Sequence, residues 1–353
     1  FTIELVRVTH AIPESSLIAV DTPVGRIINT GDYRLDPEPL DDMPSDVTRM
    51  KQLGDEGVLL LMGESTNATK PGRTPTEHTL EKSFEDIIAH AKGRVFAAVF
   101  STNMNRVQMI VDAAARHGRK VALGGRSMLE TAELAVRLGN LKIPKGTLVP
   151  LREAVNVPDS KLVVLCTGGQ GEPGAAMSRM SSGEHPQFKL KKSDTVVISS
   201  TPIPGNEISY QQVGDDLAAI GATLYRHPTH ELDGCGPLHV SGHGNQDEYA
   251  EMIQLTRPKY LMPIYGGALN RAYHRQVGLR EGLKDSHIVM AHTGEIVEFN
   301  AKGEMKRPGK VTSGAQLIDQ NGELVPNMVL VDRFDLEQSG FVVASVTIDR
   351  MTG

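Results

Sequence analysis

The chain has 353 residues, of which 39% are hydrophobic and 23% are charged. This composition excludes a disordered chain and gives room for two or three domains, each with its own core. No run of about 18 apolar residues occurs, and the N-terminus lacks the charged-then-apolar order of a signal peptide. We therefore expect no membrane contact, no secretion and a cytoplasmic location.

The formal net charge is −6, so the surface as a whole does not attract a polyanion, and a nucleic-acid partner would need a local groove. The two cysteines, Cys166 and Cys235, form no CxxC pair and are too few for a disulfide framework, so we expect buried free thiols. The chain begins with Phe1 inside a predicted strand and stops after an ordinary Met-Thr-Gly sequence. We expect that both ends are cut.

Three short strands joined by turns open the chain and predict an antiparallel start: FTIELVRV, SLIAVDTP and GRIINTGDY. A link rich in proline and aspartate follows, and then the buried strand GVLLLMG and a helix from about Thr76 to Ala91. From RVFAAVF onward, strands alternate with helices near residues 105–117, 127–138 and 210–220, through KVALGG, LVVLCTG and TVVISSTP. This order predicts parallel βαβ units in an open sheet.

The pattern changes again after residue 230. A loop leads to a helix over Asp247–Leu255, the strand KYLMPIYG and another helix. HIVMAHTGEIVEF predicts a closing β-hairpin, and the last fifty residues predict short strands that end in the apolar run GFVVASVTI.

Polar residues at the ends of predicted strands are the first candidates for chemistry. His10 ends the first strand region and Asp32 ends the third. An imidazole nitrogen and a carboxylate oxygen that leave adjacent strand ends can bind one Zn²⁺ or Mn²⁺ ion, although a lone histidine there is more often a capping or packing residue. Glu64 follows an apolar strand and is either a functional acid or a carboxylate that caps the next loop.

The segment HVSGHGNQ before a predicted helix contains His239, Ser241, Gly242 and His243. Its side-chain donors, together with free backbone N–H groups at a helix N-terminus, predict a phosphate site, and a strained turn would explain the glycines without a ligand. Ser101, Asn103 and Arg106 in FSTNMNR add polar groups at another strand end. We expect these residues to line one edge of a sheet.

Taken together, the motifs resemble those of the ribonuclease J family, which are β-CASP metallo-β-lactamase RNA nucleases. The strings that carry the resemblance span nearly the whole chain: THAIPES, NTGDY, GESTNA, KGRVFAAVFSTNMNRVQ, HGRKVALGGRSM, CTGGQGEP, STPIPGNE, HVSGHGNQ, RPKYLMPI and VTIDRMTG. The resemblance implies an α/β protein, a partial metallo-β-lactamase αββα sandwich with an inserted Rossmann-like β-CASP domain of mainly parallel strands. It places the first metallo-β-lactamase part at 1–75, the β-CASP domain at 76–238, the closing metallo-β-lactamase part at 239–308, and the start of a C-terminal domain at 309–353.

The resemblance also implies roles for the candidate residues. It makes His10 a metal ligand, Asp32 a metal-bridging carboxylate, Glu64 an acidic β-CASP residue and His243 a proton donor or oxyanion stabiliser near the scissile phosphate. It implies a phosphate clamp of His239, Ser241 and Gly242, and RNA contacts at Ser101, Asn103 and Arg106. The implied chemistry is hydrolysis of RNA at two divalent ions, zinc or manganese, by 5′–3′ exonuclease action with internal cleavage as a second activity, in RNA processing and decay.

Two departures from the family pattern limit this expectation. The family's HxHxDH cluster lies upstream of THAIPES and has no replacement in the chain, so we expect the chain alone to bind metal weakly at most and to be inactive. Where the family reads PVHGE, this sequence reads PIYGG, with Tyr265 at the ligand position and Gly267 in place of the glutamate. A phenol keeps its proton to about pH 10 and is a poor zinc ligand. His274 lies nearby, but we expect its helix to point it elsewhere.

Alternative functions remain open at this point. A degenerate family member could bind RNA or pair with an active paralogue, which the tyrosine at position 265 favours, and we expect a homo-oligomer or a paralogue complex in either case. A small-molecule metallo-hydrolase would explain His10 and Asp32 but not the βαβ insert. A nucleotide-binding Rossmann protein lacks support because no GxGxxG motif lies at a strand-to-helix turn.

Overall fold

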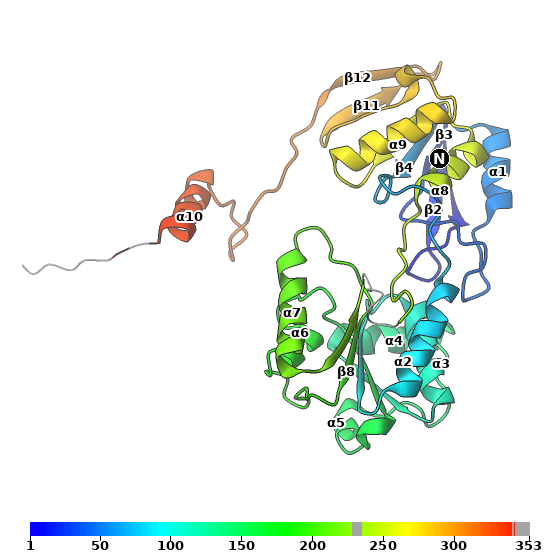
Figure 1. Cartoon of the computed structure of the whole chain (residues 1–353). Coiled ribbons are helices and arrows are strands. Elements are labelled where there is room, and N and C mark those ends of the chain that lie inside the picture. The colour runs from blue at the N-terminus through cyan, green and yellow to red at the C-terminus, as the bar shows by residue number, and fades with distance from the viewer. Residues whose placement is uncertain (228–234, 341, 343–353) are drawn as a thin grey trace, which may run out of the picture. The chain divides into compact units, whose positions relative to one another are not determined.

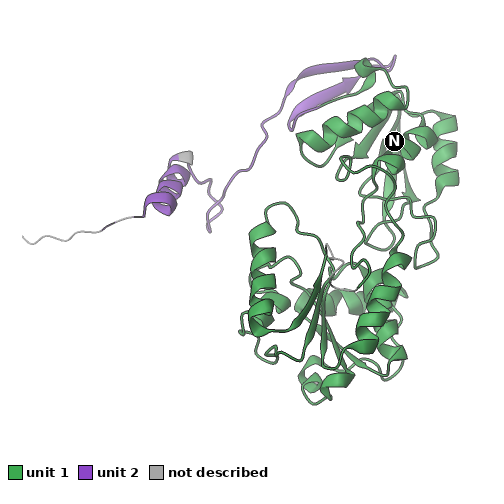
Figure 2. Ribbon diagram, in the orientation of Figure 1, with its two compact units in different colours: residues 1–290 green, residues 291–353 purple. Residues whose placement is uncertain are grey.

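A computed structural model describes residues 1–227, 235–340 and 342 of the chain. The chain divides into two compact units, residues 1–290 and residues 291–353 (Figure 2). The first unit contains two five-stranded sheets and the second contains a two-stranded sheet and a helix. The expected α/β class with mainly parallel strands is thus confirmed.

The first sheet has the order β1-β2-β3-β4-β10 (Figure 1). Its strands are β1 (Thr2–Arg7), β2 (Ser16–Thr22), β3 (Gly25–Asn29), β4 (Leu60–Glu64) and β10 (Tyr260–Ile264). The first three pair antiparallel, as the short turns between them predict, and β4 then pairs parallel to both β3 and β10. The strand from residues 260–264 therefore joins a sheet that the N-terminal 64 residues begin.

The two faces of the first sheet differ in their cover. One face packs Leu17, Ile28 and Leu61 against helices α1 (Val47–Glu56), α8 (Gln246–Thr256) and α9 (Ala268–Arg280). On β1 the alternate side chains point the other way, and Leu5 is 66% exposed opposite Ile18 of β2. This apolar outer face, Ile3, Leu5 and Ile18, has no cover within the described residues. A second sheet layer of the expected sandwich would pack on such a face.

The second sheet is entirely parallel, in the order β6-β7-β5-β8-β9. Its strands are β5 (Val95–Ala98), β6 (Lys120–Gly124), β7 (Leu162–Cys166), β8 (Thr195–Ile198) and β9 (Thr223–Arg226). The helices of ten or more residues around these strands are α2 (Glu81–His90), α3 (Met104–Arg116), α4 (Arg126–Leu138) and α7 (Glu207–Ile220). Shorter segments are η1 (Glu77–Leu80), α5 (Leu151–Ala154), η2 (Asp159–Lys161) and α6 (Ala176–Ser181). The predicted βαβ units are confirmed.

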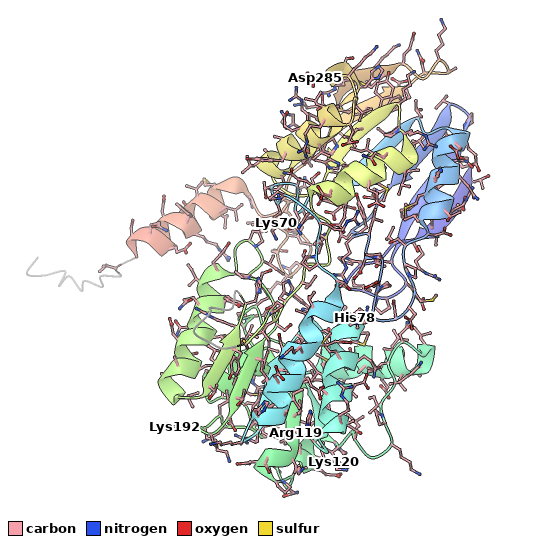
Figure 3. The ribbon with its side chains drawn as sticks, turned by 45° about the vertical axis from the view of Figure 1, so that its right-hand side comes forward. Lys70, His78, Arg119, Lys120, Lys192 and Asp285 are labelled. Atoms are coloured by element: carbon pink, nitrogen blue, oxygen red, sulfur yellow. The ribbon has the colours of Figure 1, made fainter. Side chains whose placement is uncertain are left out.

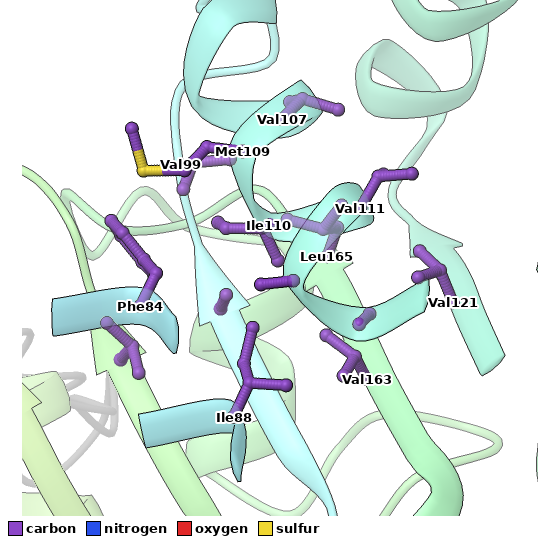
Figure 4. Close-up of a cluster of buried hydrophobic side chains, with 14 of the residues drawn as sticks. Phe84, Ile88, Val99, Val107, Met109, Ile110, Val111, Val121, Val163 and Leu165 are labelled. Atoms are coloured by element: carbon purple, nitrogen blue, oxygen red, sulfur yellow. The ribbon is translucent and has the colours of Figure 1, made fainter. Parts of the chain in front are cut away.

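Both faces of the second sheet are buried. Val163 and Leu165 of β7 face the helices α2, α3 and α4, in the cluster that Figure 4 draws. The intervening residue Val164 faces the opposite cluster, which includes Phe96 and side chains of α6 and α7. A parallel sheet with helices on both faces requires strands that are apolar throughout, which explains runs such as LVVLC.

Three expectations fail outside these sheets. The hairpin expected over 287–299 forms later in the chain, between β11 (Glu295–Phe299) and β12 (Met305–Lys310), while Ile288 makes an isolated bridge to Leu261. A helix, α10 (Asn327–Ser339), replaces the short strands expected near the C-terminus. Helix α1 follows the link of prolines and aspartates, where we expected the strand GVLLLMG to come next, and the apolar run at 340–348 lies mostly outside the described residues.

Cys166 is a buried free thiol, as expected, whereas Cys235 is partly exposed. A 3₁₀ turn, η4 (Asp285–His287), precedes the second unit. Among the described helices, none has both the length and the apolar content needed to cross a bilayer.

Candidate functional site

The candidate residues lie on loops at one end of the first sheet. His10 follows β1, and the neighbouring Thr9 forms an antiparallel bridge with Arg34, which draws the loop after β3 toward it. Asp32 lies in that loop, and Glu64 is the last residue of β4, whose parallel pairing with β3 brings their ends to the same edge. The segment of residues 239–245 returns to this edge before α8 begins.

Three side chains from these loops converge on one point. One ligand atom each of His10, Asp32 and His243 lies within 4.8 Å of the other two. The rings of the two histidines meet edge to face, with centroids 5.1 Å apart. The sequence predicted the His10–Asp32 pair, and the structure adds His243 to it. Two imidazole nitrogens and a carboxylate oxygen form a donor set that suits a divalent transition metal ion.

His10 has a fixed orientation. Its Nδ1 lies 2.7 Å from the carbonyl oxygen of Gly242, so Nδ1 donates the hydrogen and Nε2 keeps its lone pair. Burial lowers the pKa of His10, and the hydrogen bond to Gly242 only partly offsets this effect. A Cβ atom at position 242 would lie 2.7 Å from Cε1 of His10, so the close approach needs glycine. Metal-binding histidines usually donate their second nitrogen in this way.

His243 pairs with a buried carboxylate. Its Nδ1 lies 3.1 Å from Oε1 of Glu64, a side chain with no exposed surface. The other carboxylate oxygen of Glu64 accepts from the backbone N–H of Thr66 at 2.9 Å. Burial opposes a charge on His243, but the hydrogen bond and negative charge of Glu64, with a contribution from Asp32, outweigh it and raise the pKa of His243. The pair therefore orients the ring and favours its protonated form.

The loop around His243 is held by neighbouring side chains. Asn67 donates from Nδ2 to Oγ of Ser241 at 2.9 Å and to the carbonyl of His243 at 3.2 Å. The hydroxyl of Ser241 also accepts from the backbone N–H of His243 at 3.1 Å. The predicted phosphate-clamp residue Ser241 thus has two partners within the chain, and Gly242 packs against His10.

The expectation of free backbone N–H groups at the start of α8 is wrong. The N–H groups of Gln246 and Asp247 donate to the carbonyls of Lys70 and Gly72, each at 3.1 Å. The carboxylate of Glu248 accepts from the backbone N–H of Asn245 at 2.8 Å. This helix start is satisfied internally and carries acidic side chains, so it does not attract a phosphate.

Arg106 and Asn103, which we expected to contact RNA, have internal partners. Arg106 is 1% exposed and binds both carboxylate oxygens of Glu77, at 2.7 and 3.0 Å. It also donates to Nδ1 of His239 at 2.9 Å and to the carbonyl of Ser199 at 3.1 Å. Asn103 is buried and caps α3 by accepting from the N–H of Arg106. The structure brings His239 to this ion pair, while RNA contact by these residues stays a prediction.

Ser101 lies in a different setting, at a cavity of about 510 Å³ at the carboxyl ends of the central strands of the second sheet. Loops that follow β5, β6 and β7 line it, and Arg126 and Thr167 add polar groups. The carboxyl ends of strands in an open parallel sheet are the usual location of ligand sites.

Tyr265 and His274 follow β10 but do not join the converging group. Tyr265 has a positive φ of 58° and is 49% exposed. His274 of α9 is buried, places Nδ1 3.1 Å from Oγ of Ser65 and stacks on Tyr249. A Cβ atom at position 63 would lie 2.7 Å from its ring, so β4 needs Gly63 here. The expectation that His274 is not a substitute metal ligand agrees with this position.

Sequence reasoning missed Asn67 and Tyr249. The hydroxyl of Tyr249 accepts from the N–H of Asn67 at 3.0 Å and so helps to fix the turn beside Glu64. Asn67 lies within the GESTNA string, and an amide that follows the candidate acid Glu64 so closely could have indicated a role in the site. Tyr249 lies at an ordinary apolar position of its helix and gave none.

Known proteins agree with these features. A family model described as "Ribonuclease J, beta-CASP domain" matches residues 92–217, which contain β5 to β8. Ribonuclease J of Synechocystis sp. is 37% identical over 99% of this chain and 53% of its own length. Ribonuclease J of Thermus thermophilus is 35% identical over 97% of this chain and 59% of its own length. The chain belongs to the ribonuclease J family. Ribonuclease J2 of Bacillus subtilis is also similar, at 36% identity over 98% of this chain and 61% of its own length.

This ribonuclease J family chain spans between about half and three-fifths of the length of these curated relatives. Among solved structures, a protein of unknown function from Enterococcus faecalis has a TM-score of 0.53 at 16% identity, over 86% of this chain and 63% of that protein. At that identity the likeness concerns the fold alone. The family membership and the expected β-CASP fold are confirmed, and the individual site residues rest on geometry.

Proposed function

We propose that this ribonuclease J family chain provides part of the active site of a metal-dependent ribonuclease that hydrolyses RNA phosphodiesters. One observation carries the proposal: His10, Asp32 and His243 converge within 4.8 Å beside the buried Glu64, in a chain whose relatives are named ribonucleases. Removal of nucleotides from an RNA 5′ end, with internal cleavage as a second activity, follows from the family resemblance, as do a role in ribosomal RNA processing and mRNA decay and a cytoplasmic location.

The donor set fits a divalent zinc or manganese ion. Nε2 of His10 is free to coordinate because Nδ1 is bound to Gly242, and Asp32 is exposed and offers two oxygens. Two ligands, His10 and Asp32, hold a metal weakly, so we expect at most one loosely bound ion here and two ions in a protein that also carries the HxHxDH cluster. A bound ion would supply an activated water and would offset negative charge on the phosphate.

His243 is proposed as the proton donor to the leaving oxygen. Glu64 holds its Nδ1 hydrogen, so Nε2 is the nitrogen left to act at the converging point, and the hydrogen bond and charge of Glu64 raise the pKa of His243, which favours the protonated ring. A metal-ligand role for the same nitrogen is the competing assignment. Metal titration of His243→Asn separates the two, because loss of a ligand weakens metal binding and loss of a proton donor does not.

The RNA strand has a route to this point. A cavity of about 1200 Å³ is lined by His10 and by residues of β1, and it extends to Gln108 of α3 and to Lys142 beyond α4. The smaller cavity at Ser101 lies at the end of the second sheet. Because the net charge is negative, such local grooves are where a single strand would bind.

The experiment measures degradation of 5′-monophosphorylated RNA by the natural polypeptide that contains this sequence, with Mn²⁺ or Zn²⁺ and with a chelator. We expect metal-dependent loss of RNA, which His243→Asn slows by about 10²–10⁴-fold, as expected for removal of a general acid. The absence of any metal-dependent degradation would remove the proposal.

A second candidate function is an RNA-binding or partner subunit with weak catalysis, alone as a homo-oligomer or with a paralogue. The exposed Tyr265, at the position of a family ligand histidine, favours it. Tyr265→His is the discriminating variant. A rise in both metal content and RNA degradation would show that the tyrosine limits the chemistry, and unchanged values would show that it does not.

A further inference from the structure

Three nitrogen-bearing side chains lie within electrostatic reach of one another, and the proposed chemistry leaves two of them without a role. Lys70 comes from the loop after β4, His227 directly follows β9, and His239 precedes α8. The ring centroids of His227 and His239 are 5.5 Å apart. The positive charge of Lys70 acts on both of these histidines and on His243, so the ammonium group is within electrostatic reach of all three.

The backbone fixes the position of Lys70. Its N–H donates to the carbonyl of Asn67 at 2.8 Å, and its carbonyl accepts from the N–H of Gln246 at 3.1 Å. Figure 3 shows Lys70 in the region between the two sheets of residues 1–290. Its side chain is exposed and has no ion pair or hydrogen bond within the described ranges 1–227, 235–340 and 342. The positive charge is therefore not neutralised there, although partial burial lowers the pKa of Lys70.

Both imidazoles present a hydrogen on Nε2. Nδ1 of His239 lies 2.9 Å from Nη1 of Arg106, which can only donate, and 3.3 Å from the carbonyl oxygen of Ser199; the shorter contact favours the tautomer with the ring hydrogen on Nε2. Nδ1 of His227 is buried without a partner among the described residues. A buried lone pair without a partner is tolerated better than a buried N–H, so the same tautomer is favoured. Burial lowers the pKa of both rings, that of His239 to about 3, so they are neutral donors.

We propose that Lys70, His227 and His239 together bind one phosphate group of the RNA strand. The proposal rests on the ribonuclease function above and adds Lys70 and His227 to the residues that hold its substrate. One ammonium and two neutral N–H donors match a phosphate, which has one or two negative charges and several acceptor oxygens. The carboxylate of Glu77 does not compete for Lys70, because Arg106 occupies both of its oxygens.

The test is RNA binding, measured by fluorescence anisotropy on this chain without metal over a range of salt concentrations. The salt slope is the fall in the logarithm of the binding constant per tenfold rise in salt, and each phosphate contact to a single strand contributes about 0.7 to it. We therefore expect Lys70→Met to lower the slope by about 0.7. This difference corresponds to a further loss of about fivefold in affinity at ~0.1 M salt compared with ~1 M. Lys70→Arg keeps the charge and the slope. His227→Leu weakens binding without changing the slope, because it removes a neutral donor.

Lys192→Met is the matched control. Lys192 is also exposed, but it lies at the end of the second sheet's half that is away from Lys70 (Figure 3). We expect it to leave the slope unchanged. Oligonucleotides with a 5′-phosphate and with a 5′-hydroxyl identify the bound group. An effect of Lys70→Met on the phosphorylated strand alone indicates the terminal phosphate, and an equal effect on both indicates an internal phosphodiester.

The outcomes that overturn the proposals differ. If the unaltered chain binds RNA and Lys70→Met binds with the same affinity and salt slope, the phosphate site is wrong and the proposed function stands. If the unaltered chain, shown to be folded by a cooperative thermal transition, does not bind RNA at low salt, both the site and the proposed role in RNA hydrolysis lose their support.

Discussion

The two sheets of residues 1–290 differ in what surrounds them. The second sheet, β5 to β9, is buried on both faces by its own helices, whereas the first exposes apolar side chains such as Leu5 on its outer face. Yet His10, Asp32 and Glu64 all lie at the ends of strands of the first sheet. The candidate catalytic residues thus lie in the half whose sheet is covered by described residues on one face only. The other half, whose sheet is covered on both faces, packs next to them.

The largest expected effect concerns the contact between these halves. Arg106 of α3 binds Glu77 and the segment that leads back to the first sheet. Arg106→Met removes the guanidinium that binds both oxygens of the buried Glu77 and leaves only the longer ion pair with Arg34, at 3.9 Å, so we expect a loss of about 3–5 kcal/mol in the free energy of unfolding, measured with urea. The exposed Arg137→Met is the control, and we expect a change within about 0.5 kcal/mol. A loss below about 1 kcal/mol for Arg106→Met would contradict this account.

The next effect tests the complete core itself. Leu165 of β7 is fully buried among helices of the second sheet, and Leu165→Ala removes that packing. We expect a loss of about 3–4 kcal/mol in the free energy of unfolding, from the lost burial and the cavity that remains. A similar loss at Leu5→Ala, on the exposed face, would show that the two sheets are covered alike.

Acid sensitivity is expected in the first half. Burial lowers the pKa of His274 to about 4, below the ordinary value of 6.5. As the pH falls from about 6.5 to 4, the unfolded chain takes up a proton that the folded chain does not, so stability is lost in that window. At about 1.4 kcal/mol per pKa unit, the loss approaches 3 kcal/mol.

The measurement is the free energy of unfolding at pH 7.5 and 4.5 for the unaltered chain and for His274→Asn. We expect the variant to be less stable at pH 7.5, because it loses the stacking on Tyr249, but to lose less stability on acidification. An identical pH dependence for both proteins would exclude His274 as the source.

The smallest effect concerns the exposed face of the first sheet. Ile18 of β2 lies opposite Leu5, and Ile18→Thr replaces one exposed apolar group with a residue that suits a strand. We expect a change within about 0.5 kcal/mol and less self-association at high concentration, seen by sedimentation. A loss well above 1 kcal/mol would mean that this side chain is buried by a neighbour in solution.

The same contrast decides what the sequence could predict. Continuous apolar runs such as LVVLC identified strands of the second sheet, because both faces of a parallel sheet are buried. Helix α1 was missed because its start lies in a link of prolines and aspartates, although Asp46 caps it and Met50 and Leu53 have helical spacing. Helix α10 was missed within the last fifty residues, where we expected short strands, because its four successive apolar residues MVLV show no helical period.

The candidate site was predictable in part. His10 follows β1 and Asp32 follows β3, and both of these strands pair with β2, so the approach of the two side chains could be inferred. The position of His243 beside them depends on a loop whose partners are more than 170 residues away in sequence, such as Asn67. RNA contact by Arg106 was implied by the family resemblance, and the burial of Arg106 against Glu77 has no sequence signal.

The central claim is that His10, Asp32 and His243 form one metal-binding point, with His10 and Asp32 as its ligands. Isothermal titration of this chain with Zn²⁺ tests it most directly, with His10→Asn and Asp32→Asn as variants and the exposed His78→Asn as the control. We predict weak binding of one ion per chain that both variants abolish and the control retains. Binding that is unaffected by His10→Asn and Asp32→Asn would contradict the claim.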